Sequence, residues 1–353
     1  MFHLILAACL ASAPETCEPR LLPAGEARAR EDCEMRAGPI AADWLARHPD
    51  LTAGAKPRCV ETTELPALDM PEIAPGVHVH QGEMAQLSPQ NRGQIANLSF
   101  VIGKDTVAVI DAGGSRAEGE ALYAAIRRVT DKPVRHLILT HMHPDHILGA
   151  EVFSEAGAAI LADARLPDAV AQRAPTWMVS IPEQIGAAAF AGTHIAAIDH
   201  RIEAPQTVAL GGRSLHLQPV ATAHTDTDMT VFDDGSATLF AGDLIAMGLT
   251  PSLDGSLKGW LGWLDTVPDP LPDRIVPGHG PVMDSRDKAI APTRAYLGAL
   301  RDAARAALDA GQPLSQAIPA IVAAMQPISA GWADFDATTA RNASAAYAEL
   351  EWE

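Results

Sequence analysis

The spacing of hydrophobic and polar residues changes character about sixty residues into the chain. The first part predicts a small module with strands over residues 2–9, 20–22 and 58–61 and a helix from about 28 to 47. A turn through Pro14 and Cys17 separates the first two strands. The proline-rich run ELPALDMPEIAPG then predicts a linker.

After the linker, buried strands alternate with amphipathic helices. Strands are predicted in the runs GVHVHQ, NLSFVIG, TVAVIDAGG, RHLILT and AAILA, and helices in RAEGEALYAAIRRVT and over residues 146–156. Residues 163–205 are predicted to be mostly helical, with Trp177 and Met178 in a loop. Strands return in TVAL, RSLHLQPV, MTVF and ATLFA, an irregular stretch runs to Trp263, and RIVP is the last strand.

The tail from about residue 286 is predicted to be helical, with a break at residues 311–313. The pattern therefore divides the chain into three parts. These are a module over residues 1–64, a central domain over residues 65–285 and a helical extension over residues 286–353 that packs on the central domain.

Composition and charge narrow the class of protein. The chain is 48% hydrophobic and 20% charged, as globular proteins are, and no apolar run approaches the roughly 20 residues that span a bilayer. Its net charge is −18, with 26 basic residues scattered among 44 acidic ones. A nucleic-acid surface needs clustered Lys and Arg, so nucleic acid is not an expected partner.

Cysteine usage points to an oxidising compartment. The 4 cysteines all lie in the first sixty residues, at Cys9, Cys17, Cys33 and Cys59. An even number in one small segment predicts two disulfides, whose pairing among three alternatives the sequence leaves open. A zinc site of four thiolates is the rival interpretation, but the spacings contain no C-x2-C pair. Disulfides favour the periplasm or the extracellular space.

The first residues allow more than one interpretation. The run FHLILAACL is predicted to be the first strand of the module, with any export signal upstream of Met1 or removed. LAAC is similar to a lipoprotein box and Ala-Ser-Ala to a cleavage site, but a basic region before the apolar run is missing. Lipidation of Cys9 would also leave an odd number of cysteines.

The segment LTHMHPDHILGA, residues 139–150, concentrates metal-binding side chains where a predicted strand ends. His141 and His143 are two residues apart, so in extended backbone both imidazoles lie on the same side and suit one metal ion. Asp145 and His146 follow where the chain turns into a helix and can serve a second ion. Neutral imidazole and carboxylate are ligands that suit Zn²⁺.

Three further candidate ligands each follow a predicted strand. They are His224 in ATAHTD, Asp243 in FAGDLI and His279 in PGHG. A histidine-rich surface loop would explain the first motif alone but not this recurrence. The alternating His78 and His80 are instead expected on the faces of a strand, and the run DDG at residues 233–235 in a hairpin turn.

Over roughly residues 76–284 the chain resembles the metallo-β-lactamase-fold hydrolases, through the pieces VIDAGG, THMHPDH, AHTD, AGD and PGHG. The resemblance implies an α+β fold, an αββα sandwich with metal ions in a cleft at one edge of the two sheets. It also implies two zinc ions, one held by His141, His143 and His224 and the other by Asp145, His146 and His279. Asp243 would bridge the two ions, and Asp111 would orient the histidine loop by hydrogen bonds.

The activity implied by the resemblance is hydrolysis of a small molecule. Two zinc ions share a water, lower its pKa and hold hydroxide ready to attack an ester, lactone, thioester or amide. Asp145 orients the nucleophile and relays its proton. Trp260 and Trp263, in KGWLGWLD, are either a helix-packing face or a wall of the substrate cleft, since the segment lies between two candidate ligands.

The cysteine module narrows the resemblance. The pieces ACLASAPETCEPR, DCEMRA, ADWLARHPD and RCV, with RNASAAYAELEWE at the end, are similar to the quinoprotein relay system zinc metallohydrolases. That resemblance implies an exported protein associated with periplasmic quinoprotein dehydrogenases and their cytochromes. Two alternatives stay open. One is a mono-iron oxidoreductase similar to persulfide dioxygenases, and the other is a non-catalytic relay partner that docks through the cysteine module.

Overall fold

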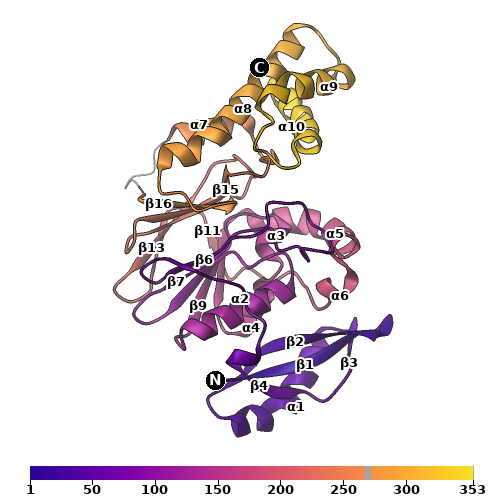
Figure 1. The fold of residues 1–353 in the computed structure, drawn as a ribbon, viewed down its shortest axis with the longest axis vertical. Coiled ribbons are helices and arrows are strands. Elements are labelled where there is room, and N and C mark those ends of the chain that lie inside the picture. Colours follow the sequence, from indigo (N-terminus) through magenta and orange to yellow (C-terminus); the bar gives the residue numbers. More distant parts are fainter. Residues whose placement is uncertain (267–271, 353) are drawn as a thin grey trace.

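Two β-sheets packed face to face form the centre of the fold (Figure 1). This computed structural model describes residues 1–266 and 272–352. The larger sheet has seven strands in the order β11-β10-β9-β8-β7-β6-β5. Their bounds in chain order are Glu72–Ala74 (β5), Val77–His80 (β6), Leu98–Ile102 (β7), Val107–Ile110 (β8), Val134–Ile138 (β9), Ala159–Asp163 (β10) and His200–Ile202 (β11).

The smaller sheet has five strands in the order β12-β13-β14-β15-β16. All its neighbours are antiparallel except β15 and β16, which run parallel. The strands are Gln206–Ala209 (β12), Ser214–Pro219 (β13), Met229–Asp233 (β14), Thr238–Ala246 (β15) and Arg274–His279 (β16).

Successive side chains along a strand point to opposite faces of the sheet, and this explains how each sheet packs against a helical layer on one face and against the other sheet on the other. In β8, Val107 and Val109 face an outer helical layer, while Ala108 and Ile110 face the core between the two sheets. Strands buried on both faces need apolar residues at nearly every position, which is why these runs are continuously hydrophobic.

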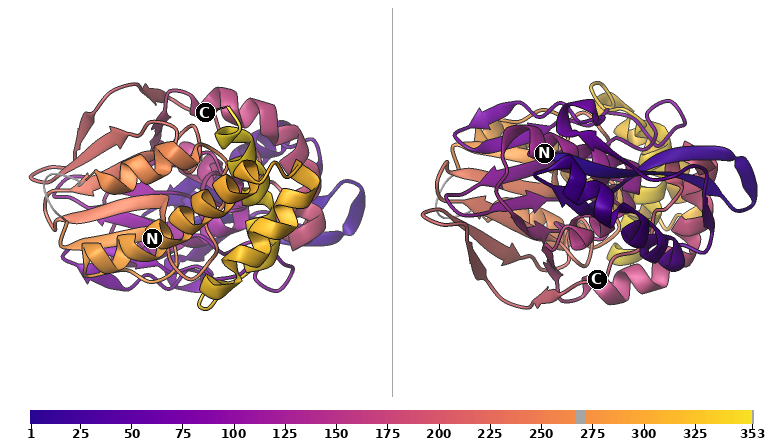
Figure 2. Two further views of the ribbon diagram at one scale, coloured as in Figure 1. Left: turned by 90° about the horizontal axis from the view of Figure 1, so that it is seen from above. Right: turned by 90° about the horizontal axis from the view of Figure 1, so that it is seen from below.

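Helices cover both outer faces and complete the αββα arrangement that the resemblance implied (Figures 1 and 2). On the larger sheet lie α2 to α6, with bounds Arg116–Val129, Pro144–Ile147, Ala150–Glu155, Leu166–Ile185 and Ala187–Phe190. On the smaller sheet lie α7 to α10, with bounds Leu257–Asp265, Arg286–Asp309, Leu314–Met325 and Phe335–Leu350. Short 3-10 turns span Thr62–Glu64 and Gln326–Ile328. Within the described residues, no helix is both long and apolar enough to cross a bilayer.

The N-terminal module is a four-stranded sheet with one helix. It consists of β1 (Phe2–Leu10), β2 (Ala13–Ala27), α1 (Arg30–Arg47), β3 (Leu51–Ala53) and β4 (Arg58–Glu61). Both predicted disulfides are formed: Cys9–Cys17 joins β1 to β2, and Cys33–Cys59 joins α1 to β4. No thiol is therefore left for a zinc site of four cysteines.

The module packs on the outer helices of the larger sheet. In β1, Leu4 and Leu6 face α1, while Ile5 points the other way and joins the core under the outer helices. Arg116 of α2 is fully buried at this junction, where its guanidinium contacts the carboxylates of Glu120, Glu151 and Glu155. The cluster contacts the module at two points: Arg116 donates to the carbonyl oxygen of Leu21 in β2 at 3.0 Å, and the indole N–H of Trp44 in α1 donates to Glu155 at 2.8 Å.

Several element predictions were wrong in detail. The second strand is much longer than residues 20–22, because β2 pairs with β1 along almost its whole length. The helix predicted over residues 146–156 is two short helices, α3 and α4. The chain bends at Gly149, where an added Cβ would lie 2.0 Å from the carbonyl oxygen of Ala112.

Two stretches predicted to be irregular are helical. Trp177 and Met178 lie within α5 and pack on the outer core, although two prolines inside this helix weakened its pattern. The stretch before Trp263 contains α7, whose Ser256 side chain caps the helix by accepting a hydrogen bond from Gly259. The predicted break in the tail is confirmed, since α8 ends at Asp309 and α9 begins at Leu314.

Candidate metal centre

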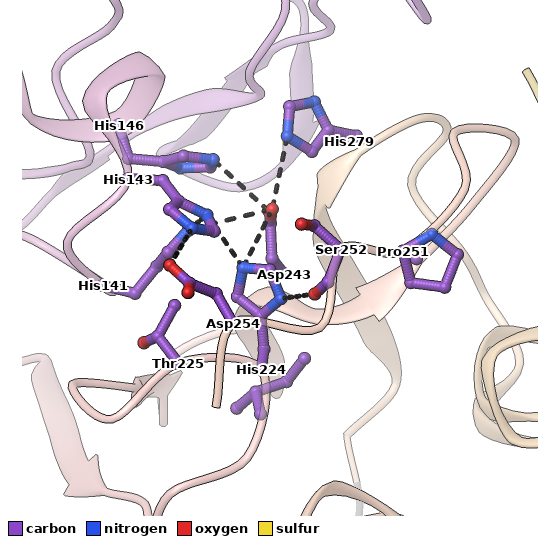
Figure 3. Close-up of polar contacts among 12 residues, drawn as sticks. His141, His143, His146, His224, Thr225, Asp243, Pro251, Ser252, Asp254 and His279 are labelled. Carbon is purple, nitrogen blue, oxygen red and sulfur yellow. Dashed lines mark hydrogen bonds and ion pairs between the residues drawn. The ribbon is translucent and has the colours of Figure 1, made fainter. Parts of the chain in front are cut away.

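The seven candidate ligands converge at one edge of the two sheets. Figure 3 labels all of them except Asp145. The histidine loop leaves the end of β9, and His224 lies in the connection between β13 and β14. Asp243 lies within β15, and His279 ends the neighbouring strand β16. Because β8, β9, β15 and β16 all direct their carboxyl ends to this edge, residues distant in sequence meet there.

Asp243 lies at the centre of the cluster, where Figure 3 shows the histidines around its carboxylate. One of its oxygens is 3.4 Å from Nε2 of His224 and 3.4 Å from Nε2 of His279, and the other is 3.3 Å from Nε2 of His146. Nε2 of His141 is 3.7 Å away. The carboxylate therefore touches members of both predicted ligand groups, as a bridging position requires.

The ligand atoms form two groups, each compact enough for one ion. One contains His141, His143, His224 and Asp243, and the other contains Asp145, His146 and His279. Nδ1 of His143 lies 3.1 Å from Nε2 of His141 and 3.0 Å from Nε2 of His224. In the second group, an oxygen of Asp145 lies 3.3 Å from Nε2 of His279.

The hydrogen bonds on the outer side of each ring assign the tautomers of the histidines. Nδ1 of His224 donates to the carbonyl oxygen of Ser252 at 2.7 Å, and Nδ1 of His279 donates to that of Ile95 at 2.8 Å. Their Nε2 atoms, which face the cluster, therefore carry lone pairs.

Asp111 orients the histidine loop in the same way. One of its oxygens accepts from Nδ1 of His146 at 2.8 Å and from the hydroxyl of Thr140 at 2.8 Å. Because the Thr140 hydroxyl donates its proton to Asp111, it accepts from Nδ1 of His141 at 3.0 Å. Asp111 holds a left-handed backbone conformation with φ of 58°, which places its carboxylate under the loop. These contacts are the ones that the expected orienting role of Asp111 requires.

The fifth ring, His143, is oriented by a residue that the sequence analysis missed. Nε2 of His143 faces a carboxylate oxygen of Asp254 at 3.4 Å, which leaves the Nδ1 lone pair facing His141 and His224. Asp254 is itself 3.7 Å from Arg173 of α5. Asp254 belongs to no motif and lies in the stretch predicted to be irregular, so no pattern in the sequence pointed to it.

Five imidazole lone pairs and two carboxylates thus face one another in a buried space. Nε2 of His146 and the Asp243 oxygen that lies 3.3 Å from it are fully buried, and neither makes a well-formed hydrogen bond. Such an arrangement repels itself unless cations occupy it. An added Cβ at Gly278 would lie 1.8 Å from the Asp243 carboxylate, so only glycine leaves room for this centre. The residues present therefore fit a pair of divalent metal ions.

In the metal-free chain, protons bound to some of the histidines supply the positive charge. Burial alone would lower the pKa of His279, but the carboxylates of Asp243 and Asp145 raise it to about 10. Against the same burial penalty, Asp145 and Asp243 raise the pKa of His146 well above its usual value. Burial lowers the pKa of His224 to about 3, so that ring stays neutral.

Metal binding at pH 7 should therefore release about two protons, from His146 and His279. Apparent metal affinity should rise with pH, because the protons that compete for these two rings are lost only as pH approaches the raised pKa values. Calorimetric titration of metal-free protein with zinc, in buffers of different ionisation enthalpy, measures this release. A titration that releases no protons would contradict the assignment of both rings.

A cavity of about 210 Å³ opens onto the cluster. Its walls come from the β6–β7 loop, the end of β15 and the segment after it, and the helix α10. The residues are Gln86, Leu87, Ile95, Ile245, Ala246, Leu249, Thr250, Pro251, Ser252, Thr338 and Arg341. The contributions of α10 and of the β6–β7 loop were not predicted, since neither segment carries a metal-binding motif.

The two tryptophans of α7 do not line this cavity. Trp260 is fully buried behind His224, with its ring 5.0 Å from the imidazole and its indole N–H donating to the carbonyl oxygen of Leu244. Trp263 lines a separate hollow beside β13. Both positions fit the helix-packing alternative. His78, stacked on Phe100, likewise lies on a strand face away from the cluster.

Comparisons with known proteins agree with this geometry. Residues 92–279, just over half of the chain, match the family described as the metallo-beta-lactamase superfamily. A stretch of 45 residues is 38% identical to the linear primary-alkylsulfatase of Pseudomonas sp. (strain ATCC 19151), which covers 13% of this chain but only 8% of that protein.

Solved structures show the same fold. A metallo-beta-lactamase from Pontibacter korlensis superimposes with a TM-score of 0.53 at 20% identity, over 65% of this chain and 99% of that one. The sec-alkylsulfatase Pisa1 from Pseudomonas sp. superimposes with a TM-score of 0.60 at 17% identity, over 79% of this chain and 50% of that one. The chain thus spans about half the length of the sulfatase. By its sequence match and its fold, this chain belongs to the metallo-β-lactamase superfamily.

Proposed function

We propose that this chain is a binuclear zinc hydrolase that works outside the cytoplasm. The observation that carries the proposal is the set of five imidazole lone pairs that face the carboxylates of Asp145 and Asp243 in two compact groups. Imidazole nitrogen and carboxylate oxygen are ligands that zinc prefers, and each group has the size of one site.

When bound, the two zinc ions would supply Lewis acidity and lower the pKa of the attacking water. The chain's own residues do the rest. In the metal-free chain His146 and His279 lower the pKa of Asp145 to about 2 against the effect of burial, and in the loaded chain the metal cations that replace their protons would keep this carboxylate ionised. It can accept a hydrogen bond from the nucleophile, orient it and take up its proton. The bond broken is an ester, lactone, thioester or amide.

A sulfate ester is a second candidate substrate. It is favoured by the 45-residue identity with an alkylsulfatase and by the fold shared with a second one. Both proteins are named for the hydrolysis of alkyl sulfates, and a pocket with apolar walls suits an alkyl chain.

Export is supported by the N-terminal module. Its two disulfides belong to an oxidising compartment such as the periplasm. The similarity of the module to quinoprotein relay system zinc metallohydrolases supports a role beside a periplasmic quinoprotein dehydrogenase or its cytochrome.

Metal analysis together with a hydrolysis panel tests the proposal. We expect two zinc ions per chain and turnover of one class among lactones, carboxylic esters, thioesters, amides, β-lactams and alkyl sulfates. An oxygen-uptake assay on the same preparation tests the iron alternative, since a persulfide dioxygenase consumes oxygen and a hydrolase does not. A zinc-loaded chain that hydrolyses none of these compounds would contradict the enzyme proposal and favour a docking role.

A further inference from the structure

The C-terminal helix α10 is fixed against the metal pocket by its neighbours. The side chain of Asn342 donates to the carbonyl oxygen of Pro251 at 2.7 Å and accepts from the backbone N–H of Leu253 at 2.9 Å. The residue between those two, Ser252, supplies the carbonyl that orients His224. Position 341, next to Asn342, is therefore held at a set place relative to the metal ligands.

Arg341 lines the pocket and keeps most of its hydrogen-bonding capacity free. Its guanidinium donates to the hydroxyl of Thr338 at 2.8 Å and lies 3.8 Å from the carboxylate of Asp334. Among the described residues it has no other side-chain partner, and the side chain is 61% exposed. A guanidinium has five N–H donors in a planar fork, so a pair of donors remains for another acceptor.

Asp334, the acidic partner of Arg341, is held in place by the β6–β7 loop as well as by α10. Asp334 has a left-handed backbone conformation and accepts hydrogen bonds from Thr338 at 2.8 Å and from Gln86 of the β6–β7 loop at 2.9 Å. The carboxylate is thus shared among several donors. It directs the guanidinium toward the pocket wall without saturating it.

The polarity of the other pocket walls limits which kind of molecule can reach Arg341. Leu87, Ile95, Ile245, Leu249 and Pro251 give these walls an apolar part, beside polar residues such as Gln86, Thr250 and Thr338. Arg341 is the one Lys or Arg among the described residues that line this cavity. With a net charge of −18, the protein as a whole repels anions, and Arg341 is a cation on the pocket wall, apart from the metal ligands, that offsets this repulsion.

We propose that Arg341 binds a carboxylate on the substrate, which makes the natural substrate an anionic molecule with an apolar body. A carboxylate matches the planar fork of the guanidinium with two parallel hydrogen bonds. The apolar walls cover the rest of the molecule while its hydrolysable bond lies at the metal ligands. This inference rests on the proposed function, because it names the substrate class of the same site.

Hydroxamate probes test the inference without requiring turnover, because the hydroxamate group chelates zinc whatever the substrate is. The zinc-loaded full chain is titrated with a series of ω-carboxy hydroxamates with two to five methylenes. Each is compared with the alkyl hydroxamate of equal length, in which a methyl group replaces the carboxylate. At the chain length that reaches Arg341, we expect the carboxylate to improve Kd by about ten-fold or more.

The variant Arg341→Met should lose this preference while its Kd for the alkyl hydroxamates stays within about two-fold of wild type. Arg341→Lys should keep part of the preference, because the charge remains but the fork is lost. Arg301→Met, at an arginine of α8 that does not line the pocket, is the matched control and should behave as wild type.

Two outcomes overturn the inference: no preference for the carboxylate at any length in the wild-type chain, or a preference that survives in Arg341→Met. Failure of the proposed function looks different. A chain that binds the probes with the expected preference but hydrolyses no compound of the panel leaves Arg341 as an anion-binding residue and removes the hydrolase. A chain that binds no hydroxamate overturns both.

Discussion

Replacing Asp243 with alanine should abolish hydrolysis and lower the metal content from two ions to at most one. The carboxylate lies within 3.4 Å of inward-facing nitrogens of His224, His279 and His146. Its loss therefore removes negative charge from both ligand groups at once. We expect turnover to fall by about 1,000-fold or more, since several kcal/mol of transition-state stabilisation depend on the metals.

Elemental analysis of the purified variant, read beside its turnover, checks this expectation. The control is Asp234→Ala, at an exposed aspartate in the turn between β14 and β15, which should keep both ions and full activity. His143→Ala gives the intermediate case, because His143 belongs to one ligand group only. It should retain one ion and lose the activity, and wild-type turnover in either site variant would refute the ligand assignment.

Replacing Arg116 with methionine should destabilise the folded chain by about 3–5 kcal/mol. The guanidinium is fully buried and holds Glu120 at 2.9 Å, Glu151 at 3.1 Å and Glu155 at 2.7 Å. It also donates to the carbonyl oxygen of Leu21 in β2, across the junction with the N-terminal module. Methionine fills much of the volume but removes the cation that three partly buried carboxylates share, and leaves them only Arg20, His48 and Trp44 as partners.

Urea denaturation followed by circular dichroism measures this loss of free energy of unfolding. The matched control is Arg47→Met, which breaks an exposed pair with Asp43 and should cost less than about 1 kcal/mol. Adding Glu120→Gln and Glu155→Gln to Arg116→Met should recover part of the loss, because unpaired charge is its main cause. A cost for Arg116→Met as small as that of the control would show that the ion cluster does not hold the junction.

The sequence predicted the convergence of the ligands better than the walls around them. His141, His224 and His279 each follow a hydrophobic run, and the ends of neighbouring strands meet at one edge of a sheet, so motif and topology reinforce each other. The disulfides followed from the number and location of the cysteines, although their pairing required the three-dimensional fold.

Residues that act through tertiary contacts left no trace in the sequence pattern. Asp254 touches His143 only because the chain folds back after β15, and Arg341 reaches the pocket only because α10 packs beside Pro251. The prediction that Trp177 lies in a loop was wrong for a related reason. Prolines inside α5 break the local helical signal, while tertiary packing on the outer core restores the helix.

The metal ligands of the pocket and several residues of its walls come from different parts of the chain. The part that matches the superfamily, residues 92–279, contains all seven proposed ligands, whereas Gln86, Leu87 and Arg341 lie outside it. Mutations in the flanking segments can therefore change which molecules are admitted without disturbing the reactive centre. Under the proposed function, substitutions at Gln86, Leu87 or Arg341 should therefore change substrate preference while the metal content stays the same.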